Sequence, residues 1–302
     1  MSKISITIGI PAYNEEANIG LVLGDVLNQK LNDGYIDQII VVSDGSRDRT
    51  VEEVKKIKNK KLVVIVNKKR QGLANVQNII IENTDSDILV ILNADIRLSD
   101  VYTLEKIISP IARGKADLVT PSVIEAGPDT FFEKILYVST KIKNMTYEKY
   151  NNGKNVYTCR GLARAFSKRL YKEIMFTSSI GEDGFSYFYC VVNNFKYSFS
   201  QDAKVIFRLP NTFQDHKKQS IRFFKSQGLL KEKFGKDFIS KSYKLPKLVL
   251  VKSLVENFIE YPSYTSLYLG VLFYLKLRSL FYKNDQDKWD ISKSSKKVKV
   301  AR

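Results

Sequence analysis

Acidic side chains follow three short apolar runs in the first 120 residues of the chain. The segments after these runs carry Glu15, Glu16, Asp44, Asp48 and Asp95. Asn14 and Asp48 could cap the helices that follow them. Capping does not explain Asp44 or Asp95, because a carboxylate beside an apolar strand costs free energy unless something binds it. The sequence therefore predicts a ligand site formed by these segments.

The chemistry at such a site must depend on carboxylates. The chain has one histidine, His216, and two cysteines, Cys159 and Cys190, with no CxxC pair. This composition excludes a disulfide scaffold, a Cys/His zinc site and any mechanism that needs two histidines. It favours a reducing compartment. The chain also lacks a GxGxxG segment after its first apolar run and a GxxxxGK[ST] loop, which argues against a dinucleotide cofactor and a P-loop ATPase.

The elements that must position these side chains alternate in type along the first 120 residues. We expect strands at residues 4–10, 39–42, 62–66, 88–92 and 118–119, and helices at 15–27, 48–57 and 73–81. The strand segments are nearly continuous Val and Ile, which is typical of strands covered on both faces. We therefore predict an α/β fold with a mostly parallel central sheet. Ligands of such sheets bind beyond the carboxyl ends of the strands, where the acidic segments lie.

From about residue 4 to 222, the chain resembles the family 2 glycosyltransferases, which have the GT-A fold. The resemblance is carried by residues 11–16 (PAYNEE), Asp44-Gly45-Ser46 with Asp48 and Thr50, Gly72-Leu73-Ala74 with Asn78, Asn93-Ala94-Asp95, and Glu182-Asp183. It implies a Rossmann-like catalytic domain that moves a sugar from a nucleotide-diphosphate sugar to a glycan or lipid-linked acceptor, with inversion. It also implies a divalent metal, Mg²⁺ or Mn²⁺, because a hard cation bound to carboxylate oxygen neutralises a leaving diphosphate.

The resemblance assigns roles to residues of the donor site. Asp95 matches the metal-binding aspartate of the DXD motif, and Asn93 replaces the first aspartate, so one negative charge is lost. Asp44 matches the aspartate that accepts a hydrogen bond from the base. Other expected donor contacts are Pro11, Ala12, Tyr13, Glu15 and Ala94. Arg70 is a candidate phosphate contact, although it could equally be solvated like Lys68 and Lys69.

The resemblance also assigns the catalytic and acceptor side. Asp183 is the expected general base, with Glu182 beside it; the alternative is an acidic first turn of a helix. Gln219 and Arg222 resemble the QxxRW motif of polysaccharide synthases with Phe223 in place of Trp, and the alternative is one turn of a basic amphipathic helix over residues 213–230. His216 is expected to be a surface residue rather than a metal ligand.

Positive charge is concentrated in the last third of the chain. The formal net charge is +17, and residues 201–302 contribute +13 of it, with 22 Lys and Arg against 9 Asp and Glu. This bias indicates an anionic partner such as a membrane surface. The longest uncharged run, residues 261–275, would reach only about 22 Å as a helix, less than the bilayer core of about 30 Å. An amphipathic helix in the membrane interface, or simple packing on the catalytic domain, is expected instead.

These observations predict the organisation of the whole chain. Residues 1–236 form the catalytic domain, with a nucleotide-binding half (1–120) and an acceptor half (121–236), and residues 237–302 form a basic helical appendage with a flexible Lys-rich tail. We expect no secretory leader, because residues 4–11 are typical of a strand, and hence a cytoplasmic enzyme on the cytoplasmic face of a membrane. No nucleic acid partner is expected. The alternative is a non-enzymatic basic module that binds membranes or nucleic acid.

Overall fold

The computed structural model describes residues 3–177 and 181–280. The expected Lys-rich tail lies outside this part of the chain. Within it, eight strands form one sheet in the order β3-β2-β1-β4-β7-β6-β8-β5. The strands are β1 (Ile4–Ala12), β2 (Gly34–Asp44), β3 (Leu62–Asn67), β4 (Ile88–Leu92), β5 (Ile96–Leu98), β6 (Leu118–Glu125), β7 (Ala163–Ser167) and β8 (Tyr197–Phe207).

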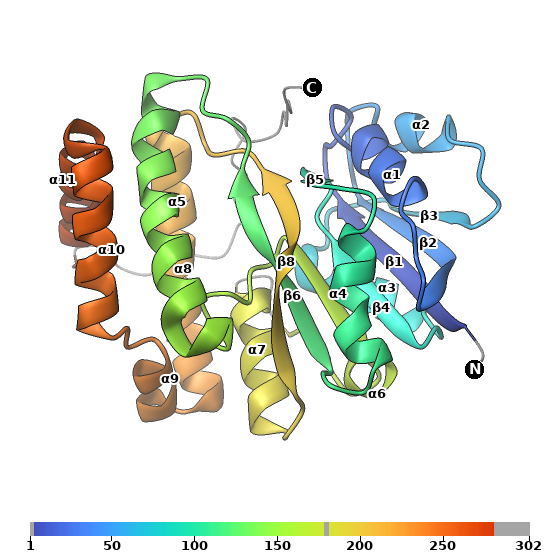
Figure 1. Ribbon diagram of the computed structural model, residues 1–302. Helices are drawn as coiled ribbons and strands as arrows, with labels where there is room; N and C mark the ends of the chain where they lie inside the picture. The colour runs from blue at the N-terminus through green and yellow to red at the C-terminus, as the bar shows by residue number, and fades with distance from the viewer. Residues whose placement is uncertain (1–2, 178–180, 281–302) are drawn as a thin grey trace.

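Strands β1 to β4 are mutually parallel, as the sequence predicts, and occupy the right half of the molecule in Figure 1. The other half is mixed: β7 runs antiparallel to β4 and β6, β8 is parallel to β6, and β5 is antiparallel to β8. The expected short strand at residues 118–119 continues to Glu125 because it pairs with β8 along its whole length. Strands β5, β7 and β8 are additions to the sequence-based expectation.

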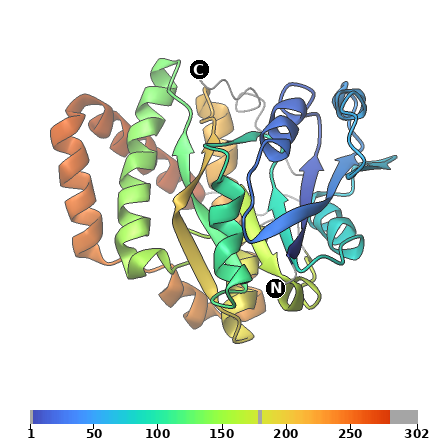
Figure 2. The same cartoon turned by 45° about the vertical axis from the view of Figure 1, so that its right-hand side comes forward.

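Alternate residues of the parallel strands enter two hydrophobic cores, one on each face of the sheet. Ile39 and Val41 of β2 face a core that includes α1 (Ile19–Leu27), α2 (Thr50–Lys55) and α4 (Thr103–Ala112). Ile40 and Val42 face a core that includes α3 (Leu73–Glu82), α6 (Lys168–Tyr171) and α7 (Glu182–Val192). Successive side chains of a strand point to opposite faces of the sheet, and both faces are covered here. A strand that is apolar at every position is therefore fully buried and stable. The two views in Figures 1 and 2 show helices on both sides of the sheet.

The remaining helices lie beside the β6–β8 half of the sheet. They are α5 (Phe131–Lys149), the 3₁₀ turn Tyr150–Gly153, α8 (Phe213–Phe234), α9 (Lys236–Ser242), α10 (Lys247–Glu260) and α11 (Pro262–Leu280). Helix α5 begins with a capping box, in which Thr130 accepts from the Glu133 amide and Glu133 accepts from the Thr130 amide. Helices α10 and α11 pack on α5 through a third core that contains Ile135, Val138, Ile142 and Tyr268. In the described part of the chain, no helix combines the length and apolarity needed to cross a membrane.

Candidate active site

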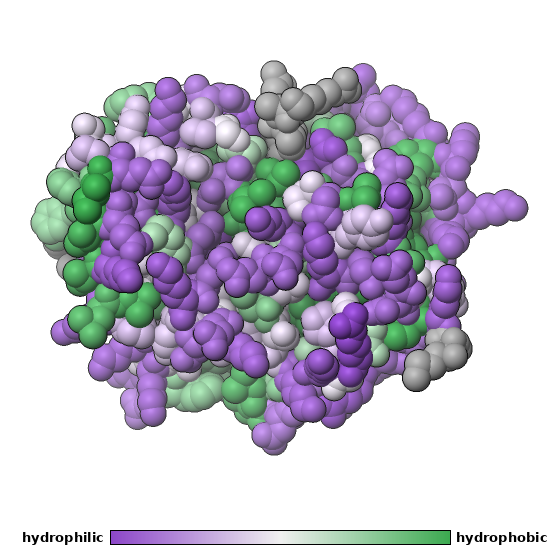
Figure 3. Space-filling model, viewed as in Figure 1, coloured by the Kyte–Doolittle hydropathy of each residue, from purple (hydrophilic) through white to green (hydrophobic). Residues whose placement is uncertain are grey.

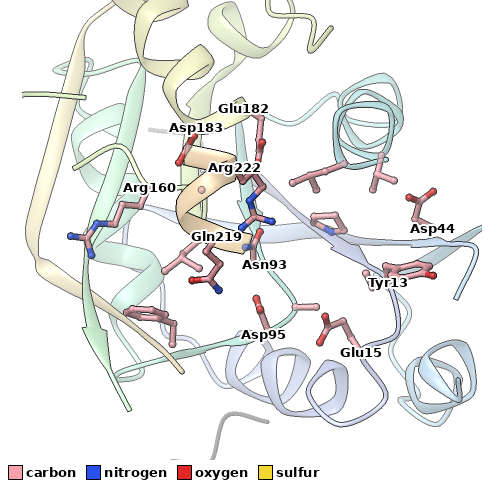
Figure 4. Close-up of a pocket in the computed structure, with 18 of the residues that line it drawn as sticks. Tyr13, Glu15, Asp44, Asn93, Asp95, Arg160, Glu182, Asp183, Gln219 and Arg222 are labelled. Carbon is pink, nitrogen blue, oxygen red and sulfur yellow. The ribbon is translucent and has the colours of Figure 1, made fainter. Parts of the chain in front are cut away.

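A cavity of about 390 Å³ opens at the edge where β1, β2 and β4 end. It also receives the start of α7 and one turn of α8, as the close-up in Figure 4 shows. Every residue expected to contact donor, metal or acceptor lines this one cavity. These residues are Pro11, Ala12, Tyr13, Glu15, Asp44, Arg70, Asn93, Ala94, Asp95, Glu182, Asp183, Gln219 and Arg222.

Asp44, the last residue of β2, is 5% exposed and forms one corner of the cavity. Its carboxylate accepts hydrogen bonds from the backbone amides of Gln71 and Gly72, each at 2.8 Å, and from Asn67 Nδ2 at 3.2 Å. The premise that only a ligand could stabilise this carboxylate is therefore wrong, because the loop before α3 supplies much of the compensation. Asp44 in turn fixes that loop, which carries Arg70.

The loops after β1 and β2 are joined to each other by side-chain hydrogen bonds. Asn14 has a left-handed backbone (φ 52°), and its Oδ1 accepts from the Arg47 amide at 2.8 Å. The expected capping role of Asn14 is therefore wrong: α1 begins at Ile19, four residues later than predicted, because the intervening chain forms a turn. Asp48 does accept from the amide of Thr50, the first residue of α2, at 3.0 Å. These bonds hold Tyr13 and Glu15 in place at the cavity wall.

Asn93 and Asp95 lie between β4 and β5. The Asn93 amide donates to the Leu162 carbonyl at 2.9 Å, which ties this turn to the segment before β7. In Figure 4, Asn93 lies below Arg222, and Asp95 lies beside Glu15. No group of three or more His, Cys, Asp or Glu side chains that could hold a metal occurs among the described residues.

Glu182 and Asp183 form the first turn of α7, on the side of the cavity opposite Asp95. Asp183 Oδ1 accepts from the Gly184 amide at 2.7 Å, and the Asp183 carbonyl accepts from Cys159 Sγ at 3.4 Å. The two residues also fit the alternative interpretation, an acidic first turn of a helix, because a helix N-terminus favours negative charge. Burial, with the nearby Asp183 charge, raises the pKa of Glu182 above its ordinary value. The two neighbouring carboxyl groups thus have different environments.

Gln219 and Arg222 lie one turn apart on α8 and both reach the cavity, as the motif predicts. The helix extends over the expected amphipathic segment and begins at Phe213, after the N-cap residue Thr212, whose hydroxyl accepts from the Asp215 amide at 3.2 Å. The surface position expected for His216 is wrong. It is half-buried against Phe132, with ring centroids 6.1 Å apart, and burial lowers its pKa to about 4.

Sequence reasoning missed several lining residues on the mixed half of the sheet, namely Arg160, Gly161, Leu162, Phe207 and Arg208. They flank β7 and β8, which the hydropathy pattern did not predict. Because β7 runs antiparallel to β4, it starts at the edge of the sheet where β4 ends. The residues just before β7 therefore lie at the edge of the sheet that carries the cavity. The sequence signal was Arg160-Gly161 directly before a short apolar segment. Arg208 is held by ion pairs to Asp129 and Glu133, both at 2.9 Å.

Similarity to solved structures identifies the class of this fold as the GT-A fold of glycosyltransferases. The mannosyltransferase PcManGT from Pyrobaculum calidifontis, solved in complex with GDP-Man and Mn²⁺, aligns with a TM-score of 0.60 at 17% identity, over 94% of this chain and 77% of that one. Residues 1–349 of S. aureus TarS, in complex with UDP-GlcNAc, align with a TM-score of 0.55 at 16% identity, over 92% and 89% of the two chains. No curated protein has a significantly similar sequence.

The family follows from the sequence itself. The model of glycosyl transferase family 2 matches residues 7–175, more than half of the chain. The chain belongs to this family and is a glycosyltransferase, so the alternative of a non-enzymatic basic module is wrong.

Proposed function

We propose that the chain transfers a sugar from a nucleoside-diphosphate sugar to an acceptor hydroxyl, with inversion at the anomeric carbon. The supporting observation is that Asp44 and Asp95 from the parallel strands, and Asp183 and Arg222 from later helices, line one cavity. In this proposal Asp44, Tyr13 and the residues around them bind the nucleoside. Arg70 and Arg222 contact the diphosphate, and Asp183 faces the acceptor.

Asp183 acts as the general base in this proposal. The acceptor oxygen forms a bond to the anomeric carbon as the bond from that carbon to the diphosphate oxygen breaks, and the hydroxyl proton passes to the Asp183 carboxylate. Attack on the face opposite the leaving diphosphate inverts the centre. A positioned base contributes roughly 10²–10⁴-fold to the rate. Arg222 and Arg70 supply positive charge to the diphosphate as it leaves.

Asp95, with Asn93, would hold a divalent cation. The donor set fits Mg²⁺ or Mn²⁺, since such ions are bound in proteins through one or two carboxylates together with substrate phosphates. When bound, the cation would supply Lewis-acid stabilisation of the diphosphate charge. Glu15 lies on the same side of the cavity as Asp95, and its carboxylate accepts from Asn18 Nδ2 at 2.9 Å.

A ligand screen followed by a transfer assay tests the proposal. Nucleotide-sugars are tested by thermal shift with Mg²⁺ or Mn²⁺, because a ligand that binds only the native state raises Tm. Release of nucleoside diphosphate is then measured with the donor selected. If no nucleotide-sugar raises Tm and none is consumed, the proposed function is wrong.

We further propose that the outer face of α10 and α11 contacts an anionic membrane surface, which would place the enzyme peripherally on the cytoplasmic side of a membrane. One face of these helices packs on α5. Packing leaves the opposite face uncovered, with Leu248 86%, Ile259 77% and Phe273 65% exposed. Figure 3 shows apolar residues gathered on the left of the molecule, where these helices lie. Lys244, Lys247 and Lys252 are exposed nearby, which suits anionic lipid.

We also propose that the chain divides at residue 236. Residues 1–236 would provide the catalytic domain, in nucleotide-binding and acceptor halves, and the helices after them the basic appendage. Helix α9 contributes Ile239 to the second core of the sheet, whereas α10 and α11 contact α5. Membrane contact would therefore fall on α10 and α11.

A further inference from the structure

A second cavity, of about 290 Å³, adjoins the first on the side of α5 and α8. The two cavities share Arg160, Asp183, Phe207 and Gln219, so Asp183 lies at their junction. A Cβ atom placed on Gly161 would lie 3.6 Å from Asp183 Cβ and 3.9 Å from Oδ2, so the Asp183 carboxylate lies directly against the residue that follows Arg160. A molecule in the second cavity would therefore reach the proposed base from the side opposite the donor.

Aromatic rings form much of the wall of this cavity. Tyr147 and Tyr157 are stacked, with centroids 4.4 Å apart and planes at 17°, and Tyr243 meets Tyr157 edge-on at 5.4 Å. The Tyr157 hydroxyl donates to the Tyr243 carbonyl at 2.6 Å, which fixes the ring. Rigid aromatic faces with a few polar groups are typical of small-molecule sites. The flat ring faces suit a saccharide ring better than a highly charged ligand alone.

Two cations complete the lining. Arg160 is half-buried and donates from Nη2 to Asn144 Oδ1 at 2.7 Å, and Lys143 lies 6.0 Å from the centre of the Tyr268 ring. Among the residues that the structure describes, no carboxylate lies within ion-pair distance of either side chain. Partly desolvated cations are costly without an anionic partner.

The nearest acidic groups do not provide that partner. Glu125 and Glu148 act on Arg160 through space, but neither lines the cavity. Glu148 accepts from Ser122 Oγ at 2.6 Å, and burial raises the pKa of Glu125 to about 7, which weakens its charge at neutral pH. His216, also in the lining, is neutral at pH 7 and adds hydrogen-bonding capacity without charge.

We propose that this cavity binds the acceptor, and that the acceptor is a saccharide carrying an anionic group, either a carboxylate or a phosphate. Its ring lies against the tyrosines, its anionic group lies at Arg160 and Lys143, and the reacting hydroxyl points to Asp183. The assignment of the bound saccharide as the acceptor rests on the proposed function. The preference of the cavity for anionic over neutral sugars can be measured by binding alone, without turnover.

Binding measurements on the full chain test the proposal. Affinities are measured by calorimetry for matched pairs that differ in charge: p-nitrophenyl glucuronide against p-nitrophenyl glucoside, and glucose 6-phosphate against glucose. We expect at least one anionic sugar to bind about 10-fold or more tightly than its neutral counterpart, equivalent to about 1.4 kcal/mol. The preference should be smaller in Lys143→Gln, because only Arg160 then remains to contact the anionic group. It should remain in Lys134→Gln, which removes the same charge from an exposed position of α5 outside the cavity.

Each other outcome overturns a defined part of the proposal. Equal affinity for charged and neutral sugars, a preference that is unchanged in Lys143→Gln, or no binding of any anionic sugar at millimolar concentration contradicts the anion site. Tighter binding of undecaprenyl phosphate than of either anionic sugar would replace the saccharide by a lipid phosphate. Donor binding by Lys143→Gln is measured in parallel. If the wild type binds no nucleotide-sugar, the proposed function fails whatever the acceptor results are.

Discussion

The guanidinium of Arg70 lies over the ring of Tyr13, 4.4 Å from its centroid. Two backbone amides that follow Arg70, those of Gln71 and Gly72, donate to Asp44. Gly45 is required here because its φ is +68° and a Cβ atom would lie 2.8 Å from the Arg70 amide nitrogen. A buried carboxylate and a close backbone contact therefore determine where the Arg70 side chain lies.

We expect Arg70→Ala to weaken nucleoside diphosphate binding by about 10-fold, the usual loss for one hydrogen bond to a charged group. Calorimetry with the nucleotide that the donor screen selects measures this. The matched control is Lys69→Ala, an exposed cation next in the sequence that does not line the cavity. Equal losses in the two variants would mean that the nucleotide responds only to general positive charge.

Asn93 and Asp95 allow the metal assignment to be tested in both directions. Asp95→Asn removes the carboxylate, so half-maximal nucleotide binding should need on the order of 10-fold more Mn²⁺. Asn93→Asp adds a second carboxylate beside it and should lower the Mn²⁺ requirement, because affinity for hard cations rises with ligand charge. Nucleotide affinity is titrated against Mn²⁺ for both. Opposite shifts support the assignment, and unchanged titrations in both variants contradict it.

The parallel half of the fold was predictable because its strands are apolar on both faces. Residues 88–92, for example, are predicted with the bounds that β4 has. Strand β8 was not predicted, because Ser198, Ser200, Gln201 and Asp202 interrupt its pattern, and β7 contains the buried Arg164. These strands exist because β6 and β4 offer pairing partners, which is tertiary information.

The residues of the candidate site also fall into those that the sequence predicts and those that depend on tertiary structure. Carboxylates at the ends of apolar strands are visible in the sequence. Glu15, Asp44 and Asp95 line the cavity, whereas Glu16 and Asp48 do not. Arg160 and Phe207 depend on β7 and β8 and were therefore missed. Lys143 and Tyr147 come from α5, a helix that no sequence motif connects to the site.

Asp117 gives a pH-dependent prediction for stability. Its carboxylate accepts from Arg169 Nε and Nη2, both at 2.8 Å, and from the Lys196 amide and the Ser167 hydroxyl, both at 2.9 Å. These contacts, Arg169 first, lower its pKa from 3.8 to about 2. Because the folded pKa is below the unfolded value, the ionised form stabilises the fold above about pH 4. That contribution is lost as the pH falls towards 2.

We therefore expect Asp117→Asn to lower the free energy of unfolding at pH 7 by about 2 kcal/mol. The variant should also lose less stability than the wild type between pH 4 and 2. Urea unfolding at several pH values measures both effects. Asp85→Asn is the control, since Asp85 is exposed although it pairs with Lys168 and Lys172. A similar loss in both variants would mean that the Asp117 contacts contribute no more than a surface pair.

The uncovered face of α10 and α11 makes the membrane proposal testable without truncation. Leu248→Asp combined with Ile259→Asp should reduce sedimentation with phosphatidylglycerol vesicles by about 10-fold or more, since each buried aliphatic side chain contributes roughly 1.5–3 kcal/mol. Neither residue belongs to the core with α5, so the fold should be retained. Met175→Asp introduces the same charge at another exposed apolar residue and should have no effect. Unchanged sedimentation of the double variant would place membrane contact elsewhere or exclude it.

Asp183 and Glu182 lie next to each other in α7, and only one of them is expected to act as the base. Asp183→Asn keeps an oxygen that can accept from the Gly184 amide, so the turn should be preserved and donor affinity unchanged. Transfer to a hydroxyl acceptor should fall at least about 10²-fold, because only basicity is removed. Glu182→Gln should lose less, since the Glu182 carboxyl is buried beside Arg164, which donates to the Glu182 carbonyl at 2.8 Å.

If Glu182→Gln abolishes transfer while Asp183→Asn does not, the two roles are exchanged. If neither variant slows transfer, the nucleophile needs no base and is an ionised phosphate, an outcome that transfer to a polyprenyl phosphate in both variants would establish.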